Sequence, residues 1–121
     1  MKHYSWDEVT FEQMNPLFGR RVVHGEHLTL ARVELKKGCQ VPLHHHENEQ
    51  ISHVLEGSLR FEIGGEEKVV RAGELVQIPP NVPHLAEALE DAVCLDIFNP
   101  IREDWLRGDD AYLREGSAPS R

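Results

Sequence analysis

Short segments in which apolar and charged residues alternate, each ended by glycine or proline, constrain the fold of this chain more than any other feature. In the clearest of them, residues 58–63, a strand would present three apolar side chains on one face and charged side chains on the other. The Gly64-Gly65 pair that follows favours a tight hairpin turn, because glycine accepts the positive φ that such turns require. Residues 67–70 would form the returning strand.

The same pattern recurs along most of the chain and predicts an all-β fold. Further strands are expected at residues 9–12, 21–24, 27–35, 50–56, 75–78, 84–89 and 92–98. Turn signals separate them about every 8–12 residues, which is typical of a sandwich or barrel. Residues 109–115 can form one or two helical turns, and residues 116–121 are expected to be frayed. The 121 residues suit a single domain with one core.

Composition narrows the classes of partner. The chain has 21 acidic and 13 basic residues, a formal charge of −8 with histidine neutral. Its cations are scattered among acids, so we expect no nucleic-acid partner, which would need a basic stripe. No apolar run approaches the ~20 residues that cross a bilayer, and the first residues lack a secretory signal, so we expect a cytoplasmic protein without a membrane partner. In that reducing compartment Cys39 and Cys94 are expected to be free, buried thiols.

The histidines are out of proportion, because the chain has eight and three of them are consecutive at positions 44–46. On a strand, His44 and His46 share one face, which makes half of a metal site. Gln50, at the start of the next strand, could supply a third ligand, and His84, at the start of another, a fourth. Imidazole is the commonest metal ligand, and an amide oxygen can complete such a sphere. The other histidines are interpreted as surface or hydrogen-bonded side chains: His3, His24, His27, His45 and His53.

The last predicted strand contains a carboxylate among apolar residues, with Cys94, Asp96 and Phe98 on one face. A buried carboxylate is costly unless a partner pairs with it. The residues alone leave two interpretations of Asp96, a hydrogen bond or ion pair at a barrel corner and a catalytic acid/base. Arg102 follows this strand and either folds back over the same barrel mouth or is solvated at the surface.

Two stretches of the chain resemble the two motifs of the cupin family. Residues 38–57 contain a glycine, five residues, H-x-H, a further ligand position and a closing glycine. Residues 73–84 contain a glycine, five residues, a proline and then a histidine, with Asn81 in place of the family's glycine. Asparagine also tolerates a positive φ. The resemblance covers about residues 27–98 and implies a double-stranded β-helix, or jelly-roll, barrel with a divalent metal ion inside.

This resemblance also implies the metal ligands, which would be His44, His46, Gln50 and His84. The family usually has glutamate at the position of Gln50, and here Glu49 comes just before it. Strand parity favours Gln50, because it shares the even register of the two histidines, and Glu49 stays the alternative. One ion per chain is expected, and imidazole and amide ligands suit Zn, Ni, Fe, Mn or Co alike.

Many cupins of this kind are homodimers, so the resemblance implies a second copy as partner. Strands within residues 1–26 would precede the barrel core, and residues 99–121 would form a C-terminal tail with a short helix. We expect the N-terminal segment around residues 9–12 to pack on the partner's barrel, because a small domain with a polar metal site has little core of its own.

A closer resemblance concerns residues 78–84 and 95–106, which are similar to the KdgF group of small cupins. Those proteins act in pectin and alginate degradation, where they convert 4,5-unsaturated monouronates released by lyases into linear 5-keto-4-deoxyuronate. The resemblance implies an isomerase-type enzyme with Asp96 as acid/base, Phe98 as a wall beside the sugar and Arg102 as carboxylate clamp. An uncharged ligand set leaves the metal its full double charge, which favours a small anionic sugar acid as substrate.

Two other functions stay open at this point. A cupin-type metal-dependent dioxygenase would need a redox-active iron and an open coordination position. A non-catalytic sugar-acid-binding module would bind uronates without converting them. The sequence identifies neither the native metal nor the preferred uronate.

Overall fold

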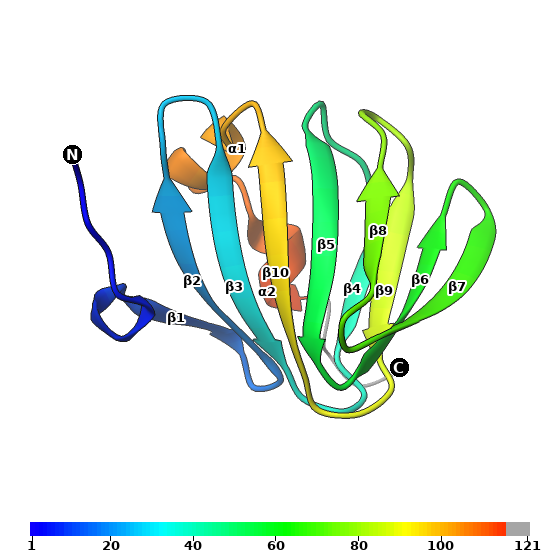
Figure 1. The fold of residues 1–121 in the computed structure, drawn as a ribbon. Coiled ribbons are helices and arrows are strands. Elements are labelled where there is room, and N and C mark those ends of the chain that lie inside the picture. Colours follow the sequence, from blue (N-terminus) through cyan, green and yellow to red (C-terminus); the bar gives the residue numbers. More distant parts are fainter. Residues whose placement is uncertain (116–121) are drawn as a thin grey trace.

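Two antiparallel sheets make up most of the computed structural model, which describes residues 1–115 (Figure 1). The six-stranded sheet runs, in spatial order, β1 (Phe11–Asn15), β2 (Phe18–His24), β3 (Thr29–Leu35), β10 (Ala92–Asn99), β5 (Glu49–Glu56) and β8 (Leu75–Ile78). The four-stranded sheet runs β4 (Gln40–His44), β9 (His84–Ala88), β6 (Ser58–Ile63) and β7 (Glu66–Arg71). A short 3-10 helix, Trp6–Glu8, precedes β1. The all-β jelly-roll prediction is confirmed.

Every strand expected over a stated range is present, with ends that differ by a few residues. β4 was expected only at the H-x-H motif, so its residues 40–43 were not predicted. Pro42 lies within β4. A proline argues against a strand in the sequence, because it has no backbone N–H to donate to a neighbouring strand. β4 can hold a proline because it is an edge strand, and its pairing with β9 shifts register between Val41 and His44. His46 lies beyond the end of β4, so the expectation that both histidines of the H-x-H motif are on one strand is wrong for His46.

Two turns show why glycine is needed. Gly64 and Gly65 have φ of 56° and 85° and join β6 to β7 as the predicted two-residue hairpin. Gly57, with φ of 77°, is the single residue between β5 and β6, where the chain passes from one sheet to the other. A Cβ atom at Gly57 would lie 2.2 Å from the carbonyl oxygen of Asp91, so no larger residue fits there. Asn81 has φ of 64°, as the second motif requires.

The core lies between the two sheets. Along β3 every second residue is buried, so one face of this strand points inward as the alternation predicts. The four-stranded sheet contributes Leu59, Phe61 and Val70. Burial of such a side chain contributes roughly 1.5–3 kcal/mol each. Cys39 and Cys94 are both buried in this core, as expected.

The C-terminal segment closes one open side of the barrel. Helix α1 (Glu103–Leu106) was not expected from the sequence, whereas α2 (Ala111–Glu115) lies within the predicted helical turns. Helix α2 packs against β1 and β4, which belong to different sheets, and both helices lie behind β3 and β10 in Figure 1. The expectation of fraying at residues 116–121 lies outside the described residues.

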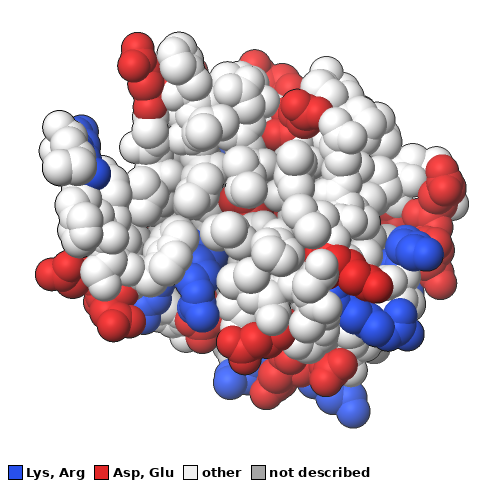
Figure 2. All heavy atoms as spheres, in the orientation of Figure 1, with Lys and Arg blue, Asp and Glu red and all other residues white. Residues whose placement is uncertain are grey.

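The surface carries mixed charge. Figure 2 shows a face that is largely uncharged in its centre, with acidic and basic side chains interspersed along the rim. Within residues 1–115, no helix is long and apolar enough to cross a bilayer.

Candidate metal centre

Three histidine side chains meet at one end of the barrel. His44 and His84 are paired residues of β4 and β9, so the sheet register brings their rings together, with centroids 4.2 Å apart. His46 reaches the same point from the loop after β4, with its ring 4.9 Å from that of His84. One nitrogen from each of the three rings lies within 4.8 Å of the others. The structure therefore brings together the three histidines that the sequence selects.

Backbone carbonyl groups orient all three rings in the same way. In each case Nδ1 donates to the carbonyl oxygen of a residue two positions away: His44 to Pro42 at 2.7 Å, His46 to Asn48 at 3.0 Å and His84 to Val82 at 2.8 Å. With Nδ1 protonated, the neutral ring carries its lone pair on Nε2. Hydrogen bonds of this kind set which nitrogen of a histidine can bind a metal.

The environment keeps these histidines neutral. Burial, together with the neighbouring His84, lowers the pKa of His44 to about 3. Burial, followed by the positive charge of Arg102, lowers the pKa of His46 to about 4. Burial is also the main cause of the lowered pKa of His84. Because only neutral imidazole binds a metal, all three side chains are in the ligating form at neutral pH.

Two features of the cluster fit a cation. Nε2 of His84 is buried without a hydrogen-bond partner among the described residues. Nε2 of His46 lies 3.1 Å from Oε1 of Gln50, and both of these atoms carry lone pairs when His46 is neutral. Two hydrogen-bond acceptors that face each other cannot bond to each other, whereas both can bind the same cation.

Gln50 reaches the cluster from β5, in the opposite sheet, and is buried. The carboxylate of Glu49 instead accepts a hydrogen bond from Gln77, a residue of β8, at the exposed surface. The two residues point to opposite faces of β5, as strand parity predicts. Gln50 thus lies beside His46, and the uncharged side chains of His44, His46, Gln50 and His84 could together hold a divalent ion.

A hydrogen-bonded chain connects Gln50 to Asp96. Nε2 of Gln50 donates to Oγ of Ser52 at 2.9 Å, and Oγ of Ser52 donates to Oδ1 of Asp96 at 2.7 Å. Sγ of Cys94 donates to the same oxygen at 3.4 Å. Burial raises the pKa of Asp96, and the bonds from Ser52 and Cys94 offset part of that effect. Sequence reasoning missed Ser52, although its position two residues after Gln50 on the same strand face was the available signal.

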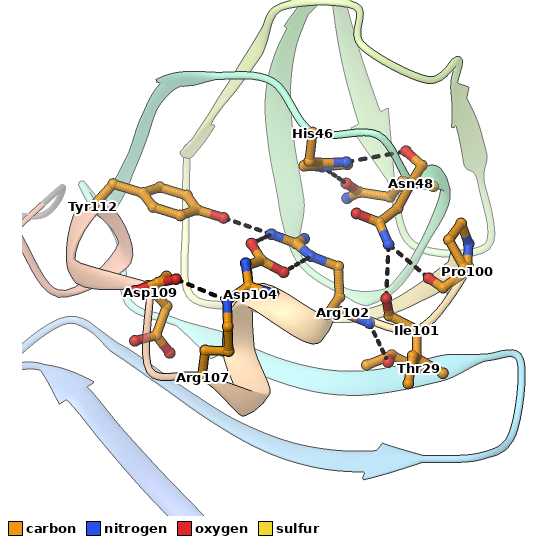
Figure 3. Close-up of polar contacts among 12 residues, drawn as sticks. Thr29, His46, Asn48, Pro100, Ile101, Arg102, Asp104, Arg107, Asp109 and Tyr112 are labelled. Atoms are coloured by element: carbon orange, nitrogen blue, oxygen red, sulfur yellow. Dashed lines mark hydrogen bonds and ion pairs between the residues drawn. The ribbon is translucent and has the colours of Figure 1, made fainter.

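Arg102 is 1% exposed and folds back over the barrel mouth. Its Nε and Nη2 donate to the two carboxylate oxygens of Asp104 at 3.0 and 2.8 Å, and Nη2 also donates to the hydroxyl of Tyr112 at 2.8 Å (Figure 3). The guanidinium stacks on Phe98 and Trp105, 4.7 and 4.4 Å from the ring centroids. The sequence did not indicate the roles of Asp104, Trp105 and Tyr112, because their partners are brought close only by the C-terminal fold.

These groups face one cavity of about 60 Å³, whose lining includes His44, Gln50, His84, Asp96, Phe98 and Arg102. His46 is not part of this lining, but its ring lies 5.5 Å from that of His44 and 4.9 Å from that of His84. Outside the cluster, His24 pairs with Oγ1 of Thr29 at 2.8 Å, in line with the hydrogen-bonded interpretation.

The two-sheet fold and the three-histidine cluster are typical of a cupin, and comparison with known proteins agrees. Residues 31–98 match the family described as Cupin domain, and the chain belongs to this family. Over 108 residues it is 28% identical to the pectin degradation protein KdgF of Dickeya dadantii (strain 3937), an alignment that covers 87% of this chain and 98% of that protein.

Solved structures give the same picture. KdgF from Halomonas sp. superposes with a TM-score of 0.81 at 29% identity, covering 86% of this chain and 99% of that one. An RmlC-like cupin from Shewanella frigidimarina NCIMB 400 also has a TM-score of 0.81, at 28% identity, covering 87% and 96%.

Proposed function

We propose that this cupin is a metal-dependent isomerase that opens the ring of 4,5-unsaturated monouronates, the products of pectin or alginate lyases, to linear 5-keto-4-deoxyuronate. The observation that carries the proposal is a single cavity lined by two of the three clustered histidines, a carboxyl group with a raised pKa and a buried arginine. Similarity over most of the chain to a pectin degradation protein supports it.

The substrate would be held by its carboxylate. Arg102 is the cation of the cavity, and guanidinium binds carboxylate through two parallel hydrogen bonds. Asp104 takes the edge formed by Nε and Nη2, so the substrate would use the edge formed by Nη1 and Nη2. Phe98, whose ring lies 5.7 Å from that of His46, would form the wall beside the sugar.

The ligands of the metal ion would be His44, His46, Gln50 and His84, one ion per chain. A divalent ion bound there keeps its full charge and supplies a Lewis acid for an oxygen of the sugar acid. The buried site excludes water, which strengthens this effect.

Asp96 would carry the proton. Its carboxylate takes the proton of the hydroxyl on C1, the bond between C1 and the ring oxygen breaks, and C1 becomes a carbonyl. The ring oxygen becomes the C5 ketone as the C4=C5 electron pair takes up the same proton at C4, so the step is a balanced isomerisation. Burial raises the pKa of the Asp96 carboxyl group, which makes its carboxylate a stronger base for taking up the proton that it then returns.

The test is the ultraviolet absorbance of the substrate's double bond, followed with purified protein and unsaturated monouronate. The wild type should remove this absorbance, and Asp96→Asn should do so roughly a hundredfold more slowly, because the amide cannot exchange the proton. Asp7→Asn, at an exposed position, is the matched control. Unchanged turnover in Asp96→Asn would refute the assignment. Binding without turnover would favour the binding module, and oxygen uptake the dioxygenase.

We also propose that two copies associate through the N-terminal segment. The edge strand β1 carries Phe11, which is 37% exposed, and Tyr4 before it is 53% exposed. Figure 1 shows this segment extending away from the barrel. Light scattering at micromolar concentration should give twice the monomer mass, and a monomer mass would contradict the proposal.

A further inference from the structure

Tyr112, on α2, links the arginine to the histidine cluster. Its hydroxyl accepts a hydrogen bond from Nη2 of Arg102 at 2.8 Å, as Figure 3 shows. Its ring centroid lies 4.8 Å from that of His44, with the two planes 37° apart. One side chain thus contacts both the group that would bind a carboxylate and the cluster that would bind a metal.

The Nη1 and Nη2 edge of the Arg102 guanidinium cannot bind a carboxylate with two hydrogen bonds in this structure. Nη2 donates to both Asp104 and Tyr112, so both of its protons are used. No hydrogen bond from Nη1 is found within residues 1–115. A carboxylate that binds two-pronged to Nη1 and Nη2 needs the donor that Tyr112 holds.

The size of the cavity also indicates that Tyr112 obstructs the binding of a sugar acid. Its volume is about 60 Å³, whereas pockets that enclose small organic ligands measure about 300 Å³ or more. Tyr112 is part of the lining. A sugar acid therefore needs both a donor and a volume that this side chain occupies.

We propose that Tyr112 is a specificity-determining residue that fills the carboxylate and sugar subsite in the free protein and is displaced when the sugar acid binds. The chemical class of the ligand rests on the proposed function. The backbone of this segment is held in place, because buried Asp110 pairs with Arg20 and the carbonyl oxygen of Leu113 accepts from Asn15 at 3.0 Å. Displacement is therefore a rotation of the Tyr112 side chain.

Binding of a sugar acid that cannot react tests this proposal. D-galacturonate has no C4=C5 double bond, so its affinity for the metal-loaded protein can be measured by titration calorimetry without turnover. Tyr112→Phe removes the competing hydroxyl and should bind it about fivefold more tightly than the wild type, which corresponds to one ordinary hydrogen bond. Tyr112→Ala should bind at least as tightly as the wild type. Tyr4→Phe, which changes the other tyrosine at an exposed position, should leave the affinity unchanged.

A second measurement needs no change at the site. The chain has two tyrosines, so tyrosine labelled with carbon-13 gives two sets of signals, and Tyr4→Phe assigns them. Galacturonate should shift the Tyr112 signals strongly and leave those of Tyr4 in place, because Tyr112 leaves the vicinity of His44.

The outcomes separate this inference from the proposed reaction. Weaker binding by Tyr112→Phe, or saturating galacturonate with unmoved Tyr112 signals, would overturn the inference even if unsaturated uronate is converted. No binding by the wild type or by either Tyr112 variant would also overturn it. Tighter binding by the variants without any conversion of unsaturated uronate would support the inference and remove the proposed reaction.

Discussion

The histidine cluster and the arginine face the same cavity, but different kinds of structure hold them. His44 and His84 are paired across two strands, and backbone carbonyls orient their rings. Arg102 follows the last strand and is held by side chains of the C-terminal segment, Asp104 and Tyr112. A sheet ladder resists displacement because many bonds must break together, whereas a side chain can rotate alone. We therefore expect the histidine cluster, the metal end of the site, to be rigid. The carboxylate end, formed by Arg102 with Asp104 and Tyr112, should be adaptable.

The largest effect should come from the rigid end. The double change His44→Ala with His46→Ala should reduce bound metal from about one ion per chain to almost none, because the two remaining donors make a poor site. Elemental analysis of untagged protein measures this, and circular dichroism verifies that the sheets persist. His45→Ala, an exposed residue between the two, is the control and should keep its metal. Full metal content in the double variant would disprove the ligand assignment.

A smaller effect is expected where the C-terminal segment is anchored to the barrel. Asp110→Asn removes the buried charged partner of Nη2 of Arg20, whose Nε keeps its ion pair with Glu12, and should lower the free energy of unfolding by about 2 kcal/mol. Urea denaturation measures the change. Asp109→Asn next to it affects an exposed pair with Arg107 and should cost less than about 1 kcal/mol. Metal content should stay at the wild-type level in both, and a loss of metal in Asp110→Asn would show that the two ends are not independent.

The smallest effect concerns substrate binding. Arg102→Ala should raise the KM for unsaturated uronate by about tenfold or more, because a charge-assisted hydrogen bond is lost. Steady-state kinetics measures it, with the metal content unchanged because Arg102 is not a ligand. Arg107→Ala, with its side chain 61% exposed, is the matched control. An unaltered KM in Arg102→Ala would mean that the carboxylate binds elsewhere.

Much of the rigid end was predictable from the sequence. The alternation of residues and the Gly64-Gly65 turn predict the strands, and parity along β5 distinguishes Gln50 from Glu49 as the residue that faces the histidines. These predictions succeed because strand geometry has a period of two, which a local pattern expresses directly. Residues 40–43 of β4 escaped prediction because Pro42 interrupts their pattern, and a proline is acceptable there because the strand is at an edge of its sheet.

The contacts of the adaptable end could not be predicted from a local sequence pattern, because they depend on the tertiary structure. The sequence by itself determined the all-β fold, the residues that meet in the barrel and the presence of Arg102 near its mouth. Only the folded chain decided that Asp104 and Tyr112 hold this arginine, that Ser52 joins Gln50 to Asp96 and that the cavity is only about 60 Å³. The Gln50–Ser52–Asp96 contacts join β5 and β10, two neighbouring strands that are far apart in the sequence, and the Arg102–Tyr112 contact joins the segment after β10 to α2. The relative positions of these elements result from packing of the whole core and follow no periodic pattern.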